Sequence, residues 1–332
     1  MLPSRSCHFL TRSRLGLRRI EGQGQQGDRK SGRHLCNRRD KLRMSNLPRR
    51  RYSAVTSICK LPASKMFPQK VPPILSHKDH AAPSAFRPEN LMREARRQRA
   101  LPAIAIPEVC ILDPDGDIVR HLRATGRAER HPGWACYHTD LFTFHHEGQE
   151  YGIVGCAVGA AFAVLIAEEM FVSGCRFVIS VTSSGQIRSV RAPPYFVIID
   201  RALRDEGTSY HYLPPADYSE ADRHLAELAR DALAAAGISV LIGATWSTDA
   251  PFRETEQAIE AASKAGILAV EMEAAALYAF AQANRRAVLC FAHVTNQMGR
   301  IEGDFEKGLA DGAEESLKIV SLVANRWREA SR

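Results

Sequence analysis

From residue 107 onward, short apolar runs alternate with amphipathic stretches, and this alternation limits the fold more than any other feature. The runs are rich in β-branched residues and have the length of strands, whereas the stretches have helical spacing. Strands that alternate with helices form a mostly parallel sheet covered on both faces. We therefore expect a single α/β domain over residues 105–330, with a central mixed, mostly parallel sheet flanked by helices. The expected strands are 109–112, 151–158, 177–181, 195–200, 238–242, 267–270 and 287–294, and the expected helices are 162–173, 220–236, 254–264, 272–283 and 311–327.

The charge of the chain is concentrated at its N-terminal end. The 332 residues carry a formal net charge of +8. Residues 1–60 hold 13 Arg and 3 Lys against three acids, a net +13, so the remainder carries −5. The predicted domain is therefore mildly acidic, and we expect no nucleic-acid partner despite the basic arm.

We expect the arm, residues 1–65, to be disordered, because it has no apolar periodicity and cannot bury enough surface to offset its ordering entropy. Three interpretations remain open. The arm is an organellar transit peptide, a tether for nucleic acid or another acidic surface, or a translated upstream stretch with initiation at Met44 or Met66. Residues 66–104 then form a linker and one helix over 88–101, where a proline stands at the start.

Cysteine usage and hydropathy indicate a reducing compartment, and we expect a cytoplasmic protein without a membrane partner. The five cysteines beyond the arm are scattered, with neither CxxC nor Cys/His metal spacing, so we expect no metal site. The longest apolar candidate for a membrane span, residues 153–172, is interrupted by Glu168 and Glu169.

Binding sites in such sheets form where strands end, and three strand ends here carry polar groups. Residues 177–186 run into Ser183, Ser184 and Gly185, a sequence that suits a sugar hydroxyl, an anion or a base edge, although an ordinary Ser/Thr turn explains it equally well. Residues 287–296 end in Asn296, whose amide can donate and accept, although asparagine is also a common turn residue.

The third strand end places Glu271, Met272 and Glu273 at the start of an Ala-rich helix. Residues i and i+2 share a face on a strand and diverge once a helix begins, so we expect one carboxylate to point into a site. That carboxylate can accept two hydrogen bonds from a vicinal diol such as ribose. Charge complementarity at a helix N-terminus accounts for one glutamate more easily than for two.

Together these segments resemble the nucleoside phosphorylase superfamily, which includes purine nucleoside phosphorylases, uridine phosphorylases and nucleosidases. The resemblance covers about 105–327 and is closest to uridine-phosphorylase-like members. The residues that carry it are Glu-Met-Glu-Ala-Ala-Ala-Leu at 271–277, Asn296, Gly159 with Glu168 and Glu169, the 180–185 segment and the stretch 246–255.

The resemblance implies roles for individual residues. Glu273 would hold the ribose hydroxyls, with Met272 packing the sugar and Ser183 contacting ribose or the attacking group. Ser184 and Gly185 would line the base. Asn296 stands where adenine-accepting members use an Asp to protonate the base, so 6-oxopurines or pyrimidines are favoured over adenosine. Phe252 could stack on the base and Arg253 could donate to a base carbonyl, although a surface ion pair explains Arg253 equally well.

The chain departs from the family at the phosphate site. Phosphorolytic relatives carry arginines where this chain has Ser180, Thr139 and either Ile118 or Gly116, and a Gly where it has Thr182. A phosphate dianion needs such charge-assisted donors. The residues that could form a water or anion site instead are Asp115, Asp117, Arg120 and His138.

Three functions therefore remain open: phosphorolysis with a rebuilt phosphate site, hydrolysis of the N-glycosidic bond, and nucleoside binding without catalysis. No cofactor is expected, with inorganic phosphate as the candidate co-substrate. The expected partners are a small-molecule nucleoside and further copies of the chain, in a dimer-based trimer or hexamer.

Overall fold

The computed structural model describes residues 71–300 and 302–331, so the basic arm lies outside the described residues. The segment before the first long helix, α1 (Pro88–Gln98), contains a single short 3₁₀ turn, η1 (Pro73–Leu75). The helix begins at the proline that the sequence analysis placed at its start and ends three residues earlier than predicted.

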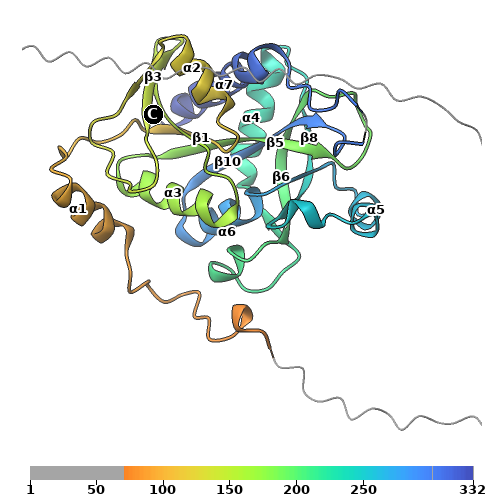
Figure 1. The fold of residues 1–332 in the computed structure, drawn as a ribbon, viewed down its shortest axis with the longest axis horizontal. Helices are drawn as coiled ribbons and strands as arrows, with labels where there is room; N and C mark the ends of the chain where they lie inside the picture. Colours follow the sequence, from red (N-terminus) through yellow and green to blue (C-terminus); the bar gives the residue numbers. More distant parts are fainter. Residues whose placement is uncertain (1–70, 301, 332) are drawn as a thin grey trace, which may run out of the picture. The chain divides into compact units, whose positions relative to one another are not determined.

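Ten strands form one mixed sheet, confirming the predicted α/β architecture (Figure 1). The seven predicted strands are all present, and several extend beyond their predicted ends. The strands are β1 (Val109–Asp113), β2 (Ala128–Arg130), β3 (Phe142–His146), β4 (Gln149–Gly155), β5 (Phe177–Gln186), β6 (Tyr195–Asp205), β7 (Tyr218–Glu220), β8 (Leu241–Thr248), β9 (Ala269–Glu271) and β10 (Ala287–Asn296).

Part of this sheet closes on itself. β5 pairs with β10, β10 with β6, β6 with β8, β8 with β9, and β9 returns to β5. β1 occupies the same edge of β5 as β9 but pairs with its first half, and β4, β3 and β2 continue from β1. The closure brings the C-terminal ends of β5 and β10 and the end of β9 together.

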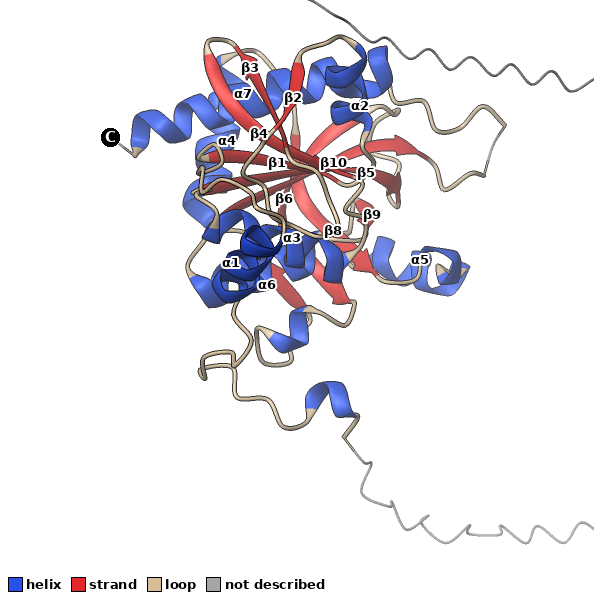
Figure 2. Ribbon diagram, turned by 60° about the vertical axis from the view of Figure 1, so that its left-hand side comes forward, coloured by secondary structure: helices blue, strands red, loops and turns tan. Residues whose placement is uncertain are grey.

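Helices cover both faces of the sheet (Figure 2). Helices α1, α3 and α6 pack on one face around Ala275, Leu277 and Met170, and α2, α4 and α7 pack on the other around Leu122, Leu233 and Val323. The helices after α1 are α2 (Asp117–Ala124), α3 (Ala160–Val172), α4 (Arg223–Ala235), α5 (Glu256–Lys264), α6 (Ala274–Asn284) and α7 (Ala313–Ala330), with short 3₁₀ turns η2 (Ser209–His211), η3 (Pro251–Arg253) and η4 (Leu309–Gly312).

Two differences from the sequence analysis matter for function. The polar segment Ser183 to Gly185 is not a turn but the last part of β5, held in extended form by β10 and β9. Residues after β1 form the short helix α2, which was not predicted because its eight residues are too few to show helical periodicity. Asp117 and Arg120 therefore lie on a helix rather than in a loop.

Candidate functional site

The three polar strand ends meet at one edge of the sheet. Parallel pairing of β5 and β10 puts His293 opposite Ser183 and Asn296 opposite Gly185. Antiparallel pairing of β5 with β9 puts Val270 opposite Gly185, immediately before the Glu-Met-Glu segment that leads into α6. This edge of the sheet is the candidate site.

The side chain of Glu271 accepts hydrogen bonds from the backbone at the N-terminal end of α6. One of its carboxylate oxygens accepts hydrogen bonds from the N–H groups of Glu273 and Ala274, both at 2.7 Å. The other oxygen accepts from the hydroxyls of Thr245, at 3.1 Å, and of Ser247. Burial raises the pKa of the Glu271 carboxyl, whereas these four donors act in the opposite direction. Glu271 therefore satisfies the first turn of the helix, and both of its carboxylate oxygens are occupied by donors of the chain.

Glu273 points elsewhere, which confirms the predicted divergence of the two carboxylates. Its Oε1 accepts from the N–H of Gly159 at 2.7 Å, and its Oε2 accepts from the hydroxyl of Thr182 at 2.9 Å and from the N–H of Met272 at 3.3 Å. The side chain is buried, and burial together with the negative charge of Glu271 raises the pKa of Glu273 to about 8.

Close packing fixes the ends of β5 and β10. A Cβ at Gly185 would lie 2.5 Å from the sulfur of Met298, so a side chain at this position would force the segment after β10 to move. Asn296 donates to the Thr295 hydroxyl at 3.2 Å and accepts from the N–H of Met298 at 2.9 Å. The hydroxyls of Ser183 and Thr295 lie 2.7 Å apart. The amide of Asn296 is therefore oriented by its neighbours.

Acidic residues after β1 reach the same edge. Asp115 accepts a hydrogen bond from the backbone N–H of Ser183 at 2.7 Å. Asp117 pairs with Arg120 and with Lys307, whose Nζ lies 2.5 Å from Oδ2 of Asp117 and 3.8 Å from Oδ1 of Asp115. The structure thus brings together three of the four residues predicted to form a water or anion site, and adds a lysine from the segment between β10 and α7.

A hollow of about 10 Å³, about the size of one water molecule, lies between these acids and the other face of β5. Asp113 and His293 line it, and both are buried. Burial raises the pKa of Asp113 to about 7 and lowers the pKa of His293 to about 4, so the imidazole is neutral at pH 7. The ring of His293 stacks on Phe196 with 4.3 Å between centroids.

Other predicted residues lie apart from this cluster. His138 packs edge-on against Phe162 of α3 and makes no hydrogen bond or ion pair with the 115–120 segment within the described residues. Phe252 is 99% exposed on η3, and Arg253 beside it is exposed too. A role for Phe252 in base stacking stays a prediction, since a residue that is 99% exposed is not packed against Glu273.

The positions where phosphorolytic relatives carry arginines have other roles here. Ser180 and Ile118 are buried, and the Thr139 hydroxyl accepts from the indole N–H of Trp134 at 3.2 Å. A Cβ at Gly116 would lie 2.6 Å from the sulfur of Cys156, so this position also excludes a long side chain.

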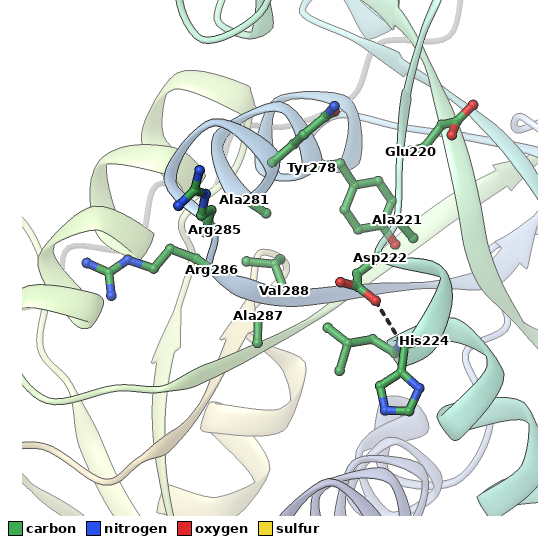
Figure 3. Close-up of a pocket in the computed structure, with 12 residues that line it drawn as sticks. Glu220, Ala221, Asp222, His224, Tyr278, Ala281, Arg285, Arg286, Ala287 and Val288 are labelled. Atoms are coloured by element: carbon green, nitrogen blue, oxygen red, sulfur yellow. Dashed lines mark hydrogen bonds between the residues drawn. The ribbon is translucent and has the colours of Figure 1, made fainter. Parts of the chain in front are cut away.

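Larger cavities lie elsewhere in the molecule. One of about 540 Å³ is lined by Arg285 and Arg286 at the C-terminal end of α6 and by Asp222 and His224 at the start of α4 (Figure 3). Glu273 precedes the opposite end of α6. Another of about 810 Å³ lies between the 79–89 segment and α3, α6 and η2. Neither of these two cavities is lined by Glu273 or by the polar strand ends. The candidate site is therefore defined by the polar groups that converge at the strand ends.

Sequence reasoning missed the contacts of Lys307 and Thr182. Lys307 lies in a stretch without periodicity, so no local signal places it beside Asp117. Thr182 was noticed only because the family has glycine there, and its hydrogen bond to Glu273 depends on the pairing of β5 with β9, which leads into the Glu-Met-Glu segment. Within residues 71–300 and 302–331, none of the helices has both the length and the apolar character needed to span a membrane.

The chain is similar to known proteins over most of its described residues. A family model described as the Phosphorylase superfamily matches residues 108–325. A DeoD-type purine nucleoside phosphorylase from Yersinia enterocolitica is 30% identical over 142 residues, which is 42% of this chain and 59% of that protein. A uridine phosphorylase from Thermococcus kodakarensis is 26% identical over 235 residues, or 62% of this chain and 84% of that protein.

A solved structure is similar in fold. The crystal structure of purine nucleoside phosphorylase from Toxoplasma gondii in complex with immucillin-H has a TM-score of 0.58 and 17% sequence identity. The similarity covers 69% of this chain and 93% of that one.

Proposed function

This chain belongs to the phosphorylase superfamily, and we propose that it cleaves the N-glycosidic bond of a nucleoside with water as the attacking group. The relatives named above are phosphorylases of purine nucleosides or uridine, which supports a nucleoside as the substrate. The choice of water depends on the residues around Ser183.

The observation that carries the proposal is the hydrogen bond from the Ser183 N–H to Asp115. A backbone N–H at a strand end is a donor for an anion such as phosphate. Here a carboxylate already accepts it at 2.7 Å, and the nearest cations, Arg120 and Lys307, are paired with Asp117. A phosphate dianion would have to approach two carboxylates, whereas water can donate a hydrogen bond to Asp115.

The proposed reaction divides the work between Asp115 and Glu273. As the bond between the sugar C1′ and the base nitrogen breaks, the bonding electrons leave with the base and the sugar becomes oxocarbenium-like. The buried carboxylate of Glu273 stabilises that positive charge. Water adds to C1′ and gives a proton to Asp115, the departing base takes up a proton from solvent, and Asp115 then releases its proton to solvent. The products are the free base and the free sugar, and the reaction needs no cofactor.

We propose a 6-oxopurine or pyrimidine base. The Asn296 amide can hydrogen-bond to a base edge but has no proton to transfer as a general acid. Replacing Asn296 by Asp supplies that acid, so we expect Asn296→Asp to raise activity on adenosine relative to inosine by about tenfold or more. Unchanged activity on adenosine, inosine and uridine would exclude Asn296 as the contact to the leaving base.

Phosphorolysis is the second candidate. Lys307 lies 3.8 Å from the Asp115 carboxylate that accepts from the Ser183 N–H, and both Lys307 and Arg120 pair with Asp117, so release from Asp117 would let them bind phosphate. A third outcome is a nucleoside-binding protein without catalysis.

Base release measured with and without phosphate distinguishes the three. Wild-type protein and Glu273→Gln are incubated with inosine, uridine and adenosine in phosphate-free buffer, and the free base is quantified. If the reaction is hydrolysis, wild-type protein releases the free base without phosphate, and added phosphate does not accelerate the release. Glu273→Gln should lose this release of base. Release that requires phosphate would establish phosphorolysis, and binding without release would establish the non-catalytic function.

We also propose that the chain assembles with further copies of itself. Helix α3 is largely apolar apart from Glu168 and Glu169, and it leaves Leu165 exposed, together with Val158 just before the helix. An apolar helix face left in solvent is typical of an interface.

A further inference from the structure

The carboxylate of Glu273 is nearly saturated with hydrogen-bond donors within the chain itself. Each carboxylate oxygen offers about two acceptor positions. Oε2 accepts from the Thr182 hydroxyl and the Met272 N–H, at 2.9 Å and 3.3 Å, and Oε1 accepts from the Gly159 N–H at 2.7 Å. One acceptor position therefore remains, and it lies on Oε1.

Of the three donors, only the Thr182 hydroxyl depends on the residue type. The other two are backbone N–H groups that any residue other than proline would supply. Thr182 is 4% exposed, and the other acceptor near its hydroxyl, the carbonyl oxygen of Ser183, is farther away at 3.4 Å. Because Glu273 is a charged acceptor at a shorter distance, the hydroxyl proton is directed to the carboxylate.

We infer that Thr182 restricts Glu273 to a single sugar hydroxyl and thereby shifts the specificity of the site towards 2′-deoxyribonucleosides. The inference rests on the proposed function, in which Glu273 faces the sugar. A ribose presents two neighbouring hydroxyls, of which only one can donate to Glu273, so the other lacks a charged acceptor unless it displaces the Thr182 hydroxyl. A 2′-deoxyribose presents only its 3′-hydroxyl and fits the single remaining position.

Protonation of Glu273 does not reverse this argument. A protonated carboxyl exchanges one acceptor position for an O–H donor, and a sugar hydroxyl can accept from that donor, so the number of positions open to the sugar stays at one. The restriction therefore applies on both sides of the pKa.

The test compares kcat/KM for 2′-deoxyinosine with that for inosine, and for 2′-deoxyuridine with that for uridine. Deoxyribosyl bonds are intrinsically easier to cleave, so the informative quantity is the change in the deoxy-to-ribo ratio between variants, in which intrinsic reactivity cancels. Thr182→Val keeps the shape and removes the hydroxyl, whereas Thr182→Ser keeps the hydroxyl and removes the methyl group. Ser180→Ala is the control, because it removes a buried hydroxyl two residues away on β5.

We expect Thr182→Val to lower the deoxy-to-ribo ratio by about tenfold or more, the effect of one mispaired hydrogen bond to a charged group. Thr182→Ser and Ser180→Ala should keep the wild-type ratio. An unchanged ratio in Thr182→Val, or the same fall in Thr182→Ser, would overturn the inference. If no nucleoside is cleaved, the proposed function is wrong, but the inference about Thr182 can still be tested by binding. Calorimetry then gives the dissociation constants of the deoxyribonucleoside and the ribonucleoside, and their ratio is compared between the variants in the same way.

Discussion

At the scale of single residues, two carboxylates two positions apart have different tasks because their donors differ. Glu271 accepts four hydrogen bonds that belong to the start of α6 and to β8. Glu273 keeps one acceptor position for a ligand and is buried. The sequence predicted the divergence because it follows from backbone geometry, but it could not predict which donors each carboxylate finds.

The raised pKa of Glu273 predicts a pH dependence of activity. Below about pH 8 the free protein holds Glu273 protonated, and a neutral carboxyl stabilises a developing positive charge poorly. We expect kcat/KM to rise with pH through an apparent pKa of about 8. Glu273→Gln should lose this rise and about 100-fold or more in kcat/KM, whereas the exposed Glu260→Gln should behave like wild type. A profile independent of pH between 6 and 9 in wild type would contradict the assignment.

The raised pKa of Glu273 also predicts that the stability of the folded protein depends on pH. The folded protein keeps on Glu273 a proton that the unfolded chain releases above pH 4.5, so this contribution is full below pH 4.5 and is lost as pH rises through about 8. The free energy of unfolding of Glu273→Gln minus that of wild type should therefore increase with pH, by at most about 1.4 kcal/mol per pH unit. Urea unfolding at pH 5 and pH 8 measures the difference, and a decrease would contradict the burial argument.

At the scale of elements, the site is made by strand ends whose positions depend on pairing. The seven predicted strands were recognisable because each is an apolar run, and the predicted helices because each has an amphipathic or Ala-rich pattern. The short elements β2, β3, β7 and α2 were missed, since they are short, partly exposed or both. The segment after β10 was also beyond prediction, because its position depends on long-range contacts, among them the ion pair of Lys307 with Asp117.

That ion pair gives a prediction for Lys307. Its ammonium offsets the repulsion between Asp115 and Asp117, and so keeps Asp115 in contact with the Ser183 N–H. We expect Lys307→Met to lower kcat by about tenfold or more with a smaller change in the KM for nucleoside, because the attacking water is misplaced. Lys307→Arg should retain most of the activity.

Lys318→Met, on the exposed face of α7, is the matched control for loss of a lysine charge. Equal losses in Lys318→Met and Lys307→Met would show that the effect is not specific to the site. Full activity of Lys307→Met would show that the ion pair does not position Asp115.

At the scale of the whole molecule, the positive net charge comes from residues 1–60, which carry +13 and precede the α/β domain. Residues 61–332 carry a net −5, and the site region is acidic where phosphorolytic relatives are expected to carry arginines. The fold was predictable because it follows from the order of strands and helices. The attacking group was not, because it depends on which charges face Ser183 in three dimensions.

The apolar face of α3 gives a prediction for assembly. We expect light scattering after gel filtration to report an oligomer at micromolar concentration, because exposed Leu165 and Val158 gain from burial against a second copy. Leu165→Glu should shift the protein towards monomer. Ile242→Glu, at another exposed apolar position, should leave the mass unchanged. A monomeric wild type would refute the proposed interface.

The central claim is that Asp115 takes the place of phosphate beside Ser183, so that water attacks the sugar. The most direct measurement is the identity of the sugar product when the protein acts on a cleavable nucleoside in ¹⁸O-labelled water with excess inorganic phosphate, followed by ³¹P NMR and mass spectrometry. The account predicts free sugar that carries ¹⁸O at its anomeric carbon and no sugar 1-phosphate. Accumulation of sugar 1-phosphate would contradict it.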